Sequence, residues 1–461
     1  MIRLFNQYVR VPYLVLGVIE FLVVLLAVQL GAFVRAHTTG WGGIIPHGLS
    51  VVIVGAAVLV SIMAMGLYQS RLRDGFEGVL VRLGVSCAAA MLILSLIFYI
   101  LPSLYLGRGV LGLAMLLSFV GMASVRFFFL RVVDVQVLKR RVLVLGAGKR
   151  AANIYKRIRR KADQRGFYIL GYVHVHGERD TIPDSRVVHL DGSLTDYVVE
   201  NEVDEIVVAI DDRRQKFPMD DLLNLKLNGV DVIDVMTFFE REMGKIETQM
   251  LYPGWLIFSE GFNRGAARNL TKRVFDISAS LALVLLTWPV MLATVLAIRL
   301  EDGAAAPFLY MQRRTGLDGE PFEVLEFRSM IENAEKDGAV WAQKDDMRVT
   351  KVGALIRKYR IDELPQLINV LRGEMAFVGP RPERPEFIGE LTEKIPYFNE
   401  RHRVKPGITG WAQLCYPYGA SDEDSEQKLQ YDLYYVKNHN LLLDLTILIQ
   451  TVEVVLFGRG R

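Results

Sequence analysis

The chain has 461 residues, more than one hydrophobic core usually serves, so we expect two or three folding units. Hydrophobic residues make up 51% of the sequence and gather in long runs near the N-terminus, which is typical of an integral membrane protein. The formal charge of +3 without a long basic run argues against nucleic acid as a partner, and two cysteines, Cys87 and Cys415, exclude a disulfide framework or a cysteine-rich zinc site.

Four apolar runs in the N-terminal part approach the length that crosses about 30 Å of hydrocarbon. They cover residues 13–34, 49–68, 83–101 and 110–133. We therefore predict a four-helix transmembrane bundle within residues 1–138. The first run is long enough to span and is not followed by a small-residue cleavage pattern, so we expect it to remain as an anchor.

Basic residues lie before the first run, between the second and third, and after the fourth: Arg3, Arg10, Arg71, Arg73, Arg82, Lys139, Arg140 and Arg141. The two alternate loops hold only Arg35 and Arg108. The positive-inside rule then places both ends of the bundle in the cytoplasm. Arg126 falls within the fourth run, and we interpret it as snorkelling or facing the bundle rather than lining an ion pathway.

A glycine turn opens an α/β pattern after the bundle. Residues 141–146 form a β-branched run, followed by the turn Gly146-Ala-Gly148 and a helical pattern through residue 160. Further strands are predicted at residues 168–175, 205–210 and 230–235, with a helix at 220–227. We predict a Rossmann-like α/β domain on the cytoplasmic side over residues 139–245.

The second strand of this domain lacks the acidic residue that usually holds the ribose hydroxyls of a dinucleotide. It runs instead into His174 and His176. We therefore favour a structural or regulatory role for the domain over a working NAD site.

A fifth apolar run covers residues 274–300, after a predicted linker at 246–271. Pro289 lies at its middle, where the missing backbone donor predicts a sharp bend. Basic residues flank both ends, namely Lys272, Arg273, Arg299, Arg313 and Arg314, so both flanks prefer the cytoplasm. A re-entrant membrane helix satisfies both flanks. The alternative is a kinked fifth transmembrane helix, which would place everything after residue 300 outside the cell.

Three blocks in the remaining sequence combine charged residues with turn formers. The first, residues 357–373, predicts a helix with Pro365 in its first turn and an end at Gly373, so Asp362 and Glu363 lie just ahead of it. The dipole of such a helix favours ionised carboxylates and bound phosphate. An adjacent acidic pair alone is usually solvated surface.

The second block, residues 377–383, holds Arg381 rigidly between two prolines, which suits a phosphate or a carboxylate. The third block, residues 401–413, joins four basic side chains to a glycine-rich turn and Trp411. It could hold a diphosphate and cover a base. Taken singly, these blocks also fit an exposed arginine and a basic loop at lipid headgroups.

Together the blocks resemble the polyprenyl-phosphate hexose-1-phosphate transferases, or monotopic phosphoglycosyl transferases. The motifs Arg-x-x-Arg-x-Asp-Glu-Leu-Pro-Gln, Gly-Pro-Arg-Pro and Lys-Pro-Gly-Ile-Thr-Gly-Trp-Ala-Gln occur in the family's order over about residues 270–461. The whole chain is similar to the family's large form, which begins exopolysaccharide or O-antigen synthesis. The resemblance implies a re-entrant helix and a mainly α, α+β catalytic domain over residues 272–461.

The resemblance also implies roles for individual residues. Asp362 matches the nucleophile, Glu363 its partner and Arg381 a phosphate-supporting arginine. We assign Arg328, Arg357 and Lys405 to the substrate phosphates, and place Gln413 and Asp432 in the active site. Three positions depart from the family pattern: Glu326 replaces a lysine, Trp288 replaces a serine before Pro289, and residues 414–419 replace a Val-Asn-Gly-Arg loop.

The activity that the resemblance implies is transfer of hexose-1-phosphate from a UDP-hexose, such as UDP-glucose or UDP-galactose, to polyprenyl (undecaprenyl) phosphate. UMP would be released through a covalent aspartyl phosphosugar, with Mg²⁺ held by Asp362 and Glu363. We expect the chain to act at the cytoplasmic face of the bacterial inner membrane, in contact with the lipid bilayer, with a homodimer as a candidate assembly and no nucleic acid partner.

Two alternatives remain at this point. A membrane-anchored NAD-dependent nucleotide-sugar epimerase or dehydratase would use the glycine turn, but no tyrosine in the chain has lysine four residues later. A non-enzymatic assembly scaffold would keep the fold without needing the acidic pair.

Overall fold

The computed structural model describes the chain except residues 1, 5–6, 10, 40–47, 69–75, 134–138, 159–165, 191, 213–216, 260, 263–264, 304, 332–346, 417–418, 420 and 457–461. It divides into two compact units, Met1–Ile2 with Val9–Met243 and Arg3–Tyr8 with Gly244–Arg461. Two short strands, β1 (Ile2–Leu4) and β2 (Gln7–Val9), pair near the N-terminus.

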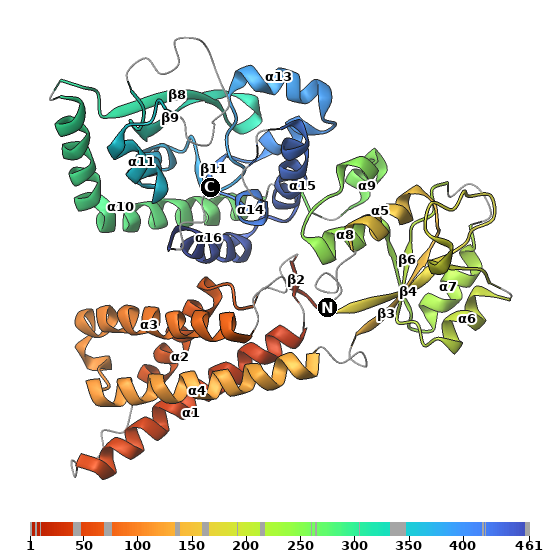
Figure 1. Cartoon of the computed structure of the whole chain (residues 1–461), viewed down its shortest axis with the longest axis horizontal. Coiled ribbons are helices and arrows are strands. Elements are labelled where there is room, and N and C mark those ends of the chain that lie inside the picture. The colour runs from red at the N-terminus through yellow and green to blue at the C-terminus, as the bar shows by residue number, and fades with distance from the viewer. Residues whose placement is uncertain are drawn as a thin grey trace. The chain divides into compact units, whose positions relative to one another are not determined.

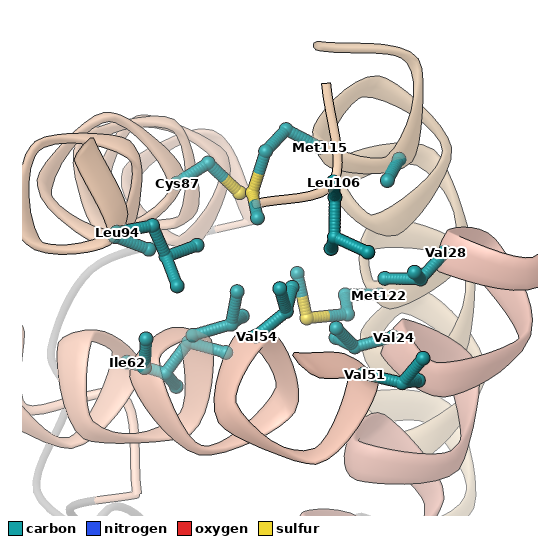
Figure 2. Packing of buried hydrophobic residues seen from close by; sticks show 14 of the residues in the cluster. Val24, Val28, Val51, Val54, Ile62, Cys87, Leu94, Leu106, Met115 and Met122 are labelled. Atoms are coloured by element: carbon teal, nitrogen blue, oxygen red, sulfur yellow. The ribbon is translucent and has the colours of Figure 1, made fainter. Parts of the chain in front are cut away.

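Four apolar helices form the N-terminal bundle, as predicted. They are α1 (Val11–Thr39), α2 (Gly48–Ala64), α3 (Phe76–Ile100) and α4 (Arg108–Val133). Their inward side chains form one continuous apolar core, and Figure 2 shows side chains such as Val54, Leu94 and Met122 converging between the helices. Gly31 lets α1 approach α4 closely, because a Cβ there would lie 3.2 Å from the backbone of Ala114.

Among the described residues, four helices are long and apolar enough to cross a membrane: Pro12–Thr38, Phe76–Ile100, Arg108–Phe129 and Ala266–Asp302. The helix α2 is also apolar but has only 17 residues. The fifth predicted run therefore belongs to the set of candidate spans.

Arg126 faces the bundle interior, in agreement with its sequence interpretation. Its guanidinium makes two contacts with Glu20 on α1, at 2.6 and 2.9 Å, and donates to the carbonyl of Leu67 at 2.9 Å. Tyr68 donates to the same carboxylate. Both charged side chains are almost fully buried, so pairing compensates for charge in an apolar setting.

The second half of this unit is an α/β domain with a parallel sheet, as predicted. The strand order is β5-β4-β3-β6-β7 and each neighbouring pair is parallel. The elements are β3 (Arg140–Leu145), α5 (Lys149–Arg157), β4 (Phe167–Val173), β5 (Val187–Val188), α6 (Leu194–Glu200), β6 (Glu205–Val208), α7 (Met219–Leu227), β7 (Asp231–Asp234) and α8 (Val235–Met243). The short strand β5 and the helix α6 were not predicted.

The other unit consists mainly of helices, with a β-hairpin and one parallel strand pair. Its elements are α9 (Pro253–Phe258), α10 (Ala266–Asp302), β8 (Leu309–Thr315), β9 (Pro321–Phe327), α11 (Lys351–Lys358), α12 (Gln366–Arg372), β10 (Ala376–Val378), α13 (Pro385–Lys394), β11 (Gly407–Thr409), α14 (Trp411–Cys415), α15 (Asp422–Asn438) and α16 (Leu441–Leu456). The described part of the segment predicted as a linker, residues 246–271, includes α9 and packs on α15, where Lys437 lies over the ring of Trp255.

The helix α10 contains Pro289, and Figure 1 shows it as two arms that meet at an angle. The first arm is held by Arg273, which donates to the carbonyls of Val370 and Leu371 at 2.6 and 2.7 Å. The second arm ends at Asp302, which pairs with Arg328 at 2.5 Å. A straight helix of 37 residues would be about 55 Å long. The bend therefore lets both ends of α10 contact the same unit.

Candidate active site

Asp362 and Glu363 lie in a 3₁₀ turn (Ile361–Glu363) between α11 and α12. The position just ahead of α12 agrees with the sequence prediction, since α12 begins at Gln366 after Pro365. Arg360 precedes the turn in the left-handed region, with φ of 59°. Such a conformation is costly for a residue other than glycine, and it turns the chain so that Arg360 contacts Glu363 three residues later.

Glu363 is buried and neutralised by two arginines. Nη1 of Arg381 donates to its Oε1 at 3.0 Å, and Nη1 of Arg360 lies 3.0 Å from the same oxygen. Burial alone would favour the protonated acid, but Arg381 and Arg360 outweigh it and hold the pKa of Glu363 below its usual value. The ionised form of Glu363 is therefore favoured, and its Oε1 contacts two guanidinium groups.

Asp362 has a different environment. Its Oδ1 is buried and has no hydrogen-bond partner among the described residues. Burial, followed by the charges of Glu363 and Glu326, raises the pKa of Asp362 to about 7. The sequence argument that a helix dipole keeps this carboxylate ionised was wrong, because desolvation and two neighbouring acids outweigh the effect of the seven-residue helix.

Glu326 on β9 is a third acid of the site and was not among the predicted site residues. Its Oε1 accepts from Nε2 of Gln366 at 3.0 Å. Its pKa is raised by burial and then by the charge of Glu363. The sequence did point to this position, because Glu326 stands where the family has a lysine.

The second and third blocks meet through paired strands. β10 and β11 are parallel, with Ala376 opposite Gly407 and Val378 opposite Thr409. The amide of Gly407 donates to the carbonyl of Pro380 at 2.9 Å. A Cβ on Gly407 would lie 2.0 Å from the nitrogen of Gly379, so only glycine allows this approach. The strand pair thus fixes the backbone next to Arg381.

Asp432 acts on this backbone through Arg401. Nη2 of Arg401 lies 2.7 Å from Oδ2 of Asp432 on α15 and donates to the carbonyl oxygen of Arg381 at 2.9 Å. Arg401 and Asp432 are 5% and 1% exposed. Asp432 was predicted as an active-site residue, and in the structure it contacts Arg401, which in turn donates to the backbone of Arg381, the residue that contacts Glu363.

The other predicted residues lie at varying distances from the acidic pair. Arg357 on α11 is close enough to lower the pKa of Asp362 through its charge. Both side-chain polar atoms of Gln413 are buried without a partner in the described structure, and its Oε1 would lie 3.4 Å from a Cβ on Gly410. A Cβ on Gly410 would also lie 2.3 Å from the carbonyl oxygen of Gly379, so Gln413 lies near the Arg381 segment.

The described contacts of Lys405 and Arg328 are with residues other than the acidic pair. Nζ of Lys405 lies near Gly373, at the far end of α12, and its pKa is lowered by burial and by the charge of Arg273. Arg328 pairs with Asp302 at the end of α10. Their role as phosphate ligands stays a prediction.

The acidic pair fits a magnesium ion that shares its ligands with a substrate. No group of three or more His, Cys, Asp or Glu side chains suited to a metal occurs in the described part of the chain. Mg²⁺, however, usually takes one or two carboxylates and completes its shell with phosphates and water. Oδ1 of Asp362, which meets no partner among the described residues, and the second oxygen of Glu363 would suit that arrangement, because both arginines contact Oε1.

Comparisons with known proteins find similar sequences over two parts of the chain. A model of the bacterial sugar transferase family matches residues 267–458, and a model described as a CoA-binding domain matches residues 63–225. The chain is 42% identical over 191 residues to an uncharacterized sugar transferase, EpsL, of Bacillus subtilis, of which it covers 90%. That match takes in 41% of this chain.

Two further relatives have more specific names. The chain is 46% identical over 189 residues to the UDP-N-acetylgalactosamine-undecaprenyl-phosphate N-acetylgalactosaminephosphotransferase of Aeromonas hydrophila, over 41% of this chain. It is 33% identical over 333 residues to the undecaprenyl-phosphate glucose phosphotransferase of Komagataeibacter xylinus, over 70% of this chain. It spans 44% and 60% of these two proteins, less than two thirds in each case.

Proposed function

The chain belongs to the bacterial sugar transferase family, and from this premise we propose that it is a phosphoglycosyl transferase that moves a sugar-1-phosphate from a UDP-hexose to undecaprenyl phosphate. The names of both of these relatives include undecaprenyl phosphate and a sugar phosphotransferase, and one also includes a UDP-sugar. The observation that carries the proposal is the buried Oδ1 of Asp362, which has no partner among the described residues and lies beside a carboxylate already neutralised by two arginines.

In the first half-reaction Asp362 is the nucleophile. An oxygen of its ionised carboxylate attacks the phosphorus that bears the sugar, and the bond from that phosphorus to the bridging oxygen breaks. UMP leaves with the bridging oxygen, and an aspartyl phosphosugar remains on the protein. Because Glu363 is tied to Arg381 and Arg360, Asp362 is the carboxylate free to make this bond.

In the second half-reaction an oxygen of undecaprenyl phosphate attacks the same phosphorus. The acyl phosphate bond breaks, the carboxylate of Asp362 is regenerated, and the sugar is joined to the lipid through a diphosphate. Arg381, whose side chain is 34% exposed, stabilises the phosphoryl oxygens during both displacements. When Mg²⁺ is bound at Asp362 and Glu363, it neutralises charge on the diphosphate.

The bent helix α10 supports a site at the membrane surface. Leu285, Leu286 and Trp288 near Pro289 are 74%, 73% and 57% exposed, so the described protein leaves the apolar bend uncovered. Lipid would cover it. Both ends of the helix return to the unit that carries Asp362, which supports a re-entrant helix and a catalytic unit on the cytoplasmic side of the inner membrane.

A product assay tests the activity. Purified protein is incubated with undecaprenyl phosphate, Mg²⁺ and a panel of UDP-sugars, and UMP and lipid-linked sugar are measured. We expect UMP and the lipid product in equal amounts with one or two donors. Release of UDP instead of UMP would contradict phosphosugar transfer, and conversion of the UDP-sugar itself would favour the epimerase alternative.

A further inference from the structure

The glycine turn of the α/β domain is the place where a nucleotide would bind in a domain of this topology. It joins β3 to α5 at the carboxyl end of the sheet, with β4 and β6 on either side of β3. In dinucleotide-binding domains the backbone amides at the start of this helix hold the diphosphate, and a glycine lets the diphosphate approach. The match to a CoA-binding domain over residues 63–225 implies such a ligand.

In this chain the amides at the start of α5 are already bonded. Lys149 donates from its backbone to Oδ2 of Asp211 at 2.8 Å, and Arg150 donates to Oδ1 of the same carboxylate at 2.9 Å. Asp211 comes from the loop that follows β6, so the neighbouring strand delivers it to the turn. A single carboxylate thus takes the two hydrogen bonds that a phosphate would take.

Gly148 is explained by the same carboxylate. A Cβ on Gly148 would lie 2.4 Å from Oδ2 of Asp211 and 3.2 Å from Oε2 of Glu178. The absence of a side chain therefore makes room for an acidic group of the protein itself. Glycine at this position is accounted for without a ligand.

A second acid holds the first in place. The backbone nitrogen of Asp211 donates to Oε1 of Glu178 at 2.5 Å. The pKa of Glu178 is raised, first by burial and also by the charge of Asp211. An incoming diphosphate would have to displace Asp211 and then lie beside two acidic side chains, which repel it.

From this geometry we infer that Asp211 is an internal substitute for the nucleotide phosphate, and that the α/β domain is closed to CoA, NAD and other nucleoside diphosphates at its glycine turn. The inference goes beyond the transferase reaction and does not depend on it. The family-implied nucleotide does not fit the residues that the chain places there.

A binding experiment on the full-length protein in detergent tests the inference. ADP carries the diphosphate shared by CoA and NAD, so ADP, CoA and NAD are titrated by equilibrium dialysis into wild type and Asp211→Ala. We expect no saturable binding to wild type, and ADP binding at least tenfold tighter in Asp211→Ala. Saturable binding of CoA, NAD or ADP to wild type would overturn the inference. A folded Asp211→Ala protein that binds ADP no more tightly than wild type would also overturn it. Asp196→Ala, which removes an acid from the start of another helix of the domain, should gain no binding.

Thermal unfolding gives a second test that needs no ligand. Gly148→Ala should lower the unfolding temperature, because the added Cβ meets the carboxylate of Asp211. In an Asp211→Ala background, Gly148→Ala should lower the unfolding temperature much less, because the carboxylate that the added Cβ would meet is gone. An equal decrease in unfolding temperature in the two backgrounds would show that Gly148 does not accommodate Asp211, and would overturn the inference.

Discussion

Arg381 donates to Glu363 at 3.0 Å, so the second acid of the pair is neutralised inside the protein, while Oδ1 of Asp362 beside it has no partner in the part of the chain that the structure describes. Two adjacent carboxylates therefore have opposite pKa shifts. Burial and like charges raise the pKa of Asp362 to about 7, while Arg381 and Arg360 hold the pKa of Glu363 low in spite of burial. When the pKa values of two neighbouring acids are shifted in opposite directions, the two acids can have distinct roles in a reaction.

The raised pKa predicts the pH dependence of the reaction. The nucleophile must be ionised, so activity is present above the pKa of Asp362 and is lost as pH falls through it. We expect kcat/KM for the UDP-sugar to have an acidic limb with a midpoint near 7, with about a tenfold loss for each further pH unit. A midpoint near 4, the usual value for aspartate, would contradict the role given to burial and to the neighbouring acids.

Two substitutions should move that limb in opposite directions. Glu326→Gln removes a negative charge that raises the pKa of Asp362, so the midpoint should fall. Arg357→Ala removes a positive charge that lowers it, so the midpoint should rise. The midpoint is read from the full pH profile, which separates this effect from any change in maximal rate.

The contact from Asp432 through Arg401 to the carbonyl of Arg381 predicts that Asp432 positions Arg381. Asp432→Asn keeps the shape of the side chain but weakens the ion pair, and a misplaced Arg381 should lower kcat on the order of a hundredfold. Asp422→Asn, the same substitution at an exposed position of the same helix, should leave kcat unchanged.

A double-mutant cycle separates positioning from general destabilisation. If Asp432 acts through Arg381, then adding Asp432→Asn to Arg381→Ala should lower kcat little further. If the fold decreases in kcat of the two single variants multiply in the double variant, Asp432 contributes independently of Arg381. Unfolding temperatures of all four proteins serve as the check on folding.

The two ends of α10 predict a topology that labelling can test. Single cysteines replace Ala267 and Ala305 on the two flanks, and Ser103 between α3 and α4, in a protein without Cys87 and Cys415. An impermeant maleimide added to intact cells should label only position 103, whereas permeabilised cells should show labelling at all three. Labelling of position 305 but not 267 in intact cells would indicate a helix that crosses the membrane once.

Local patterns were enough to predict much of the fold. The apolar runs predicted all four helices of the bundle, and the alternation of β-branched runs with a helix predicted the parallel sheet, because period and length depend on neighbouring residues alone. The ordered motifs likewise identify Asp362, Glu363 and Arg381 as candidate site residues from the sequence alone.

The partners of buried charges could not be predicted in this way. Glu20 and Arg126 are 106 residues apart, and Asp211 reaches Lys149 across 62 residues. Which acids meet which donors depends on how the elements pack. The raised pKa of Asp362 could not be predicted for the same reason, since burial and the proximity of Glu326 depend on tertiary packing.

The central claim is that Asp362 forms a covalent bond to the phosphosugar, and one measurement addresses it directly. A UDP-sugar labelled with ³²P in the phosphate that bears the sugar is mixed with the protein and Mg²⁺ without any lipid acceptor. Label on the denatured protein is counted, and free UMP, which carries no label, is measured by chromatography. Wild type should retain label and release an equal amount of UMP in a single burst, and undecaprenyl phosphate should then remove the label. Asp362→Asn should do neither, whereas Glu363→Gln should label slowly, because its nucleophile is intact. If no label attaches to wild type, or if UMP appears only when the lipid acceptor is present, the transfer is direct and the role assigned to Asp362 is contradicted.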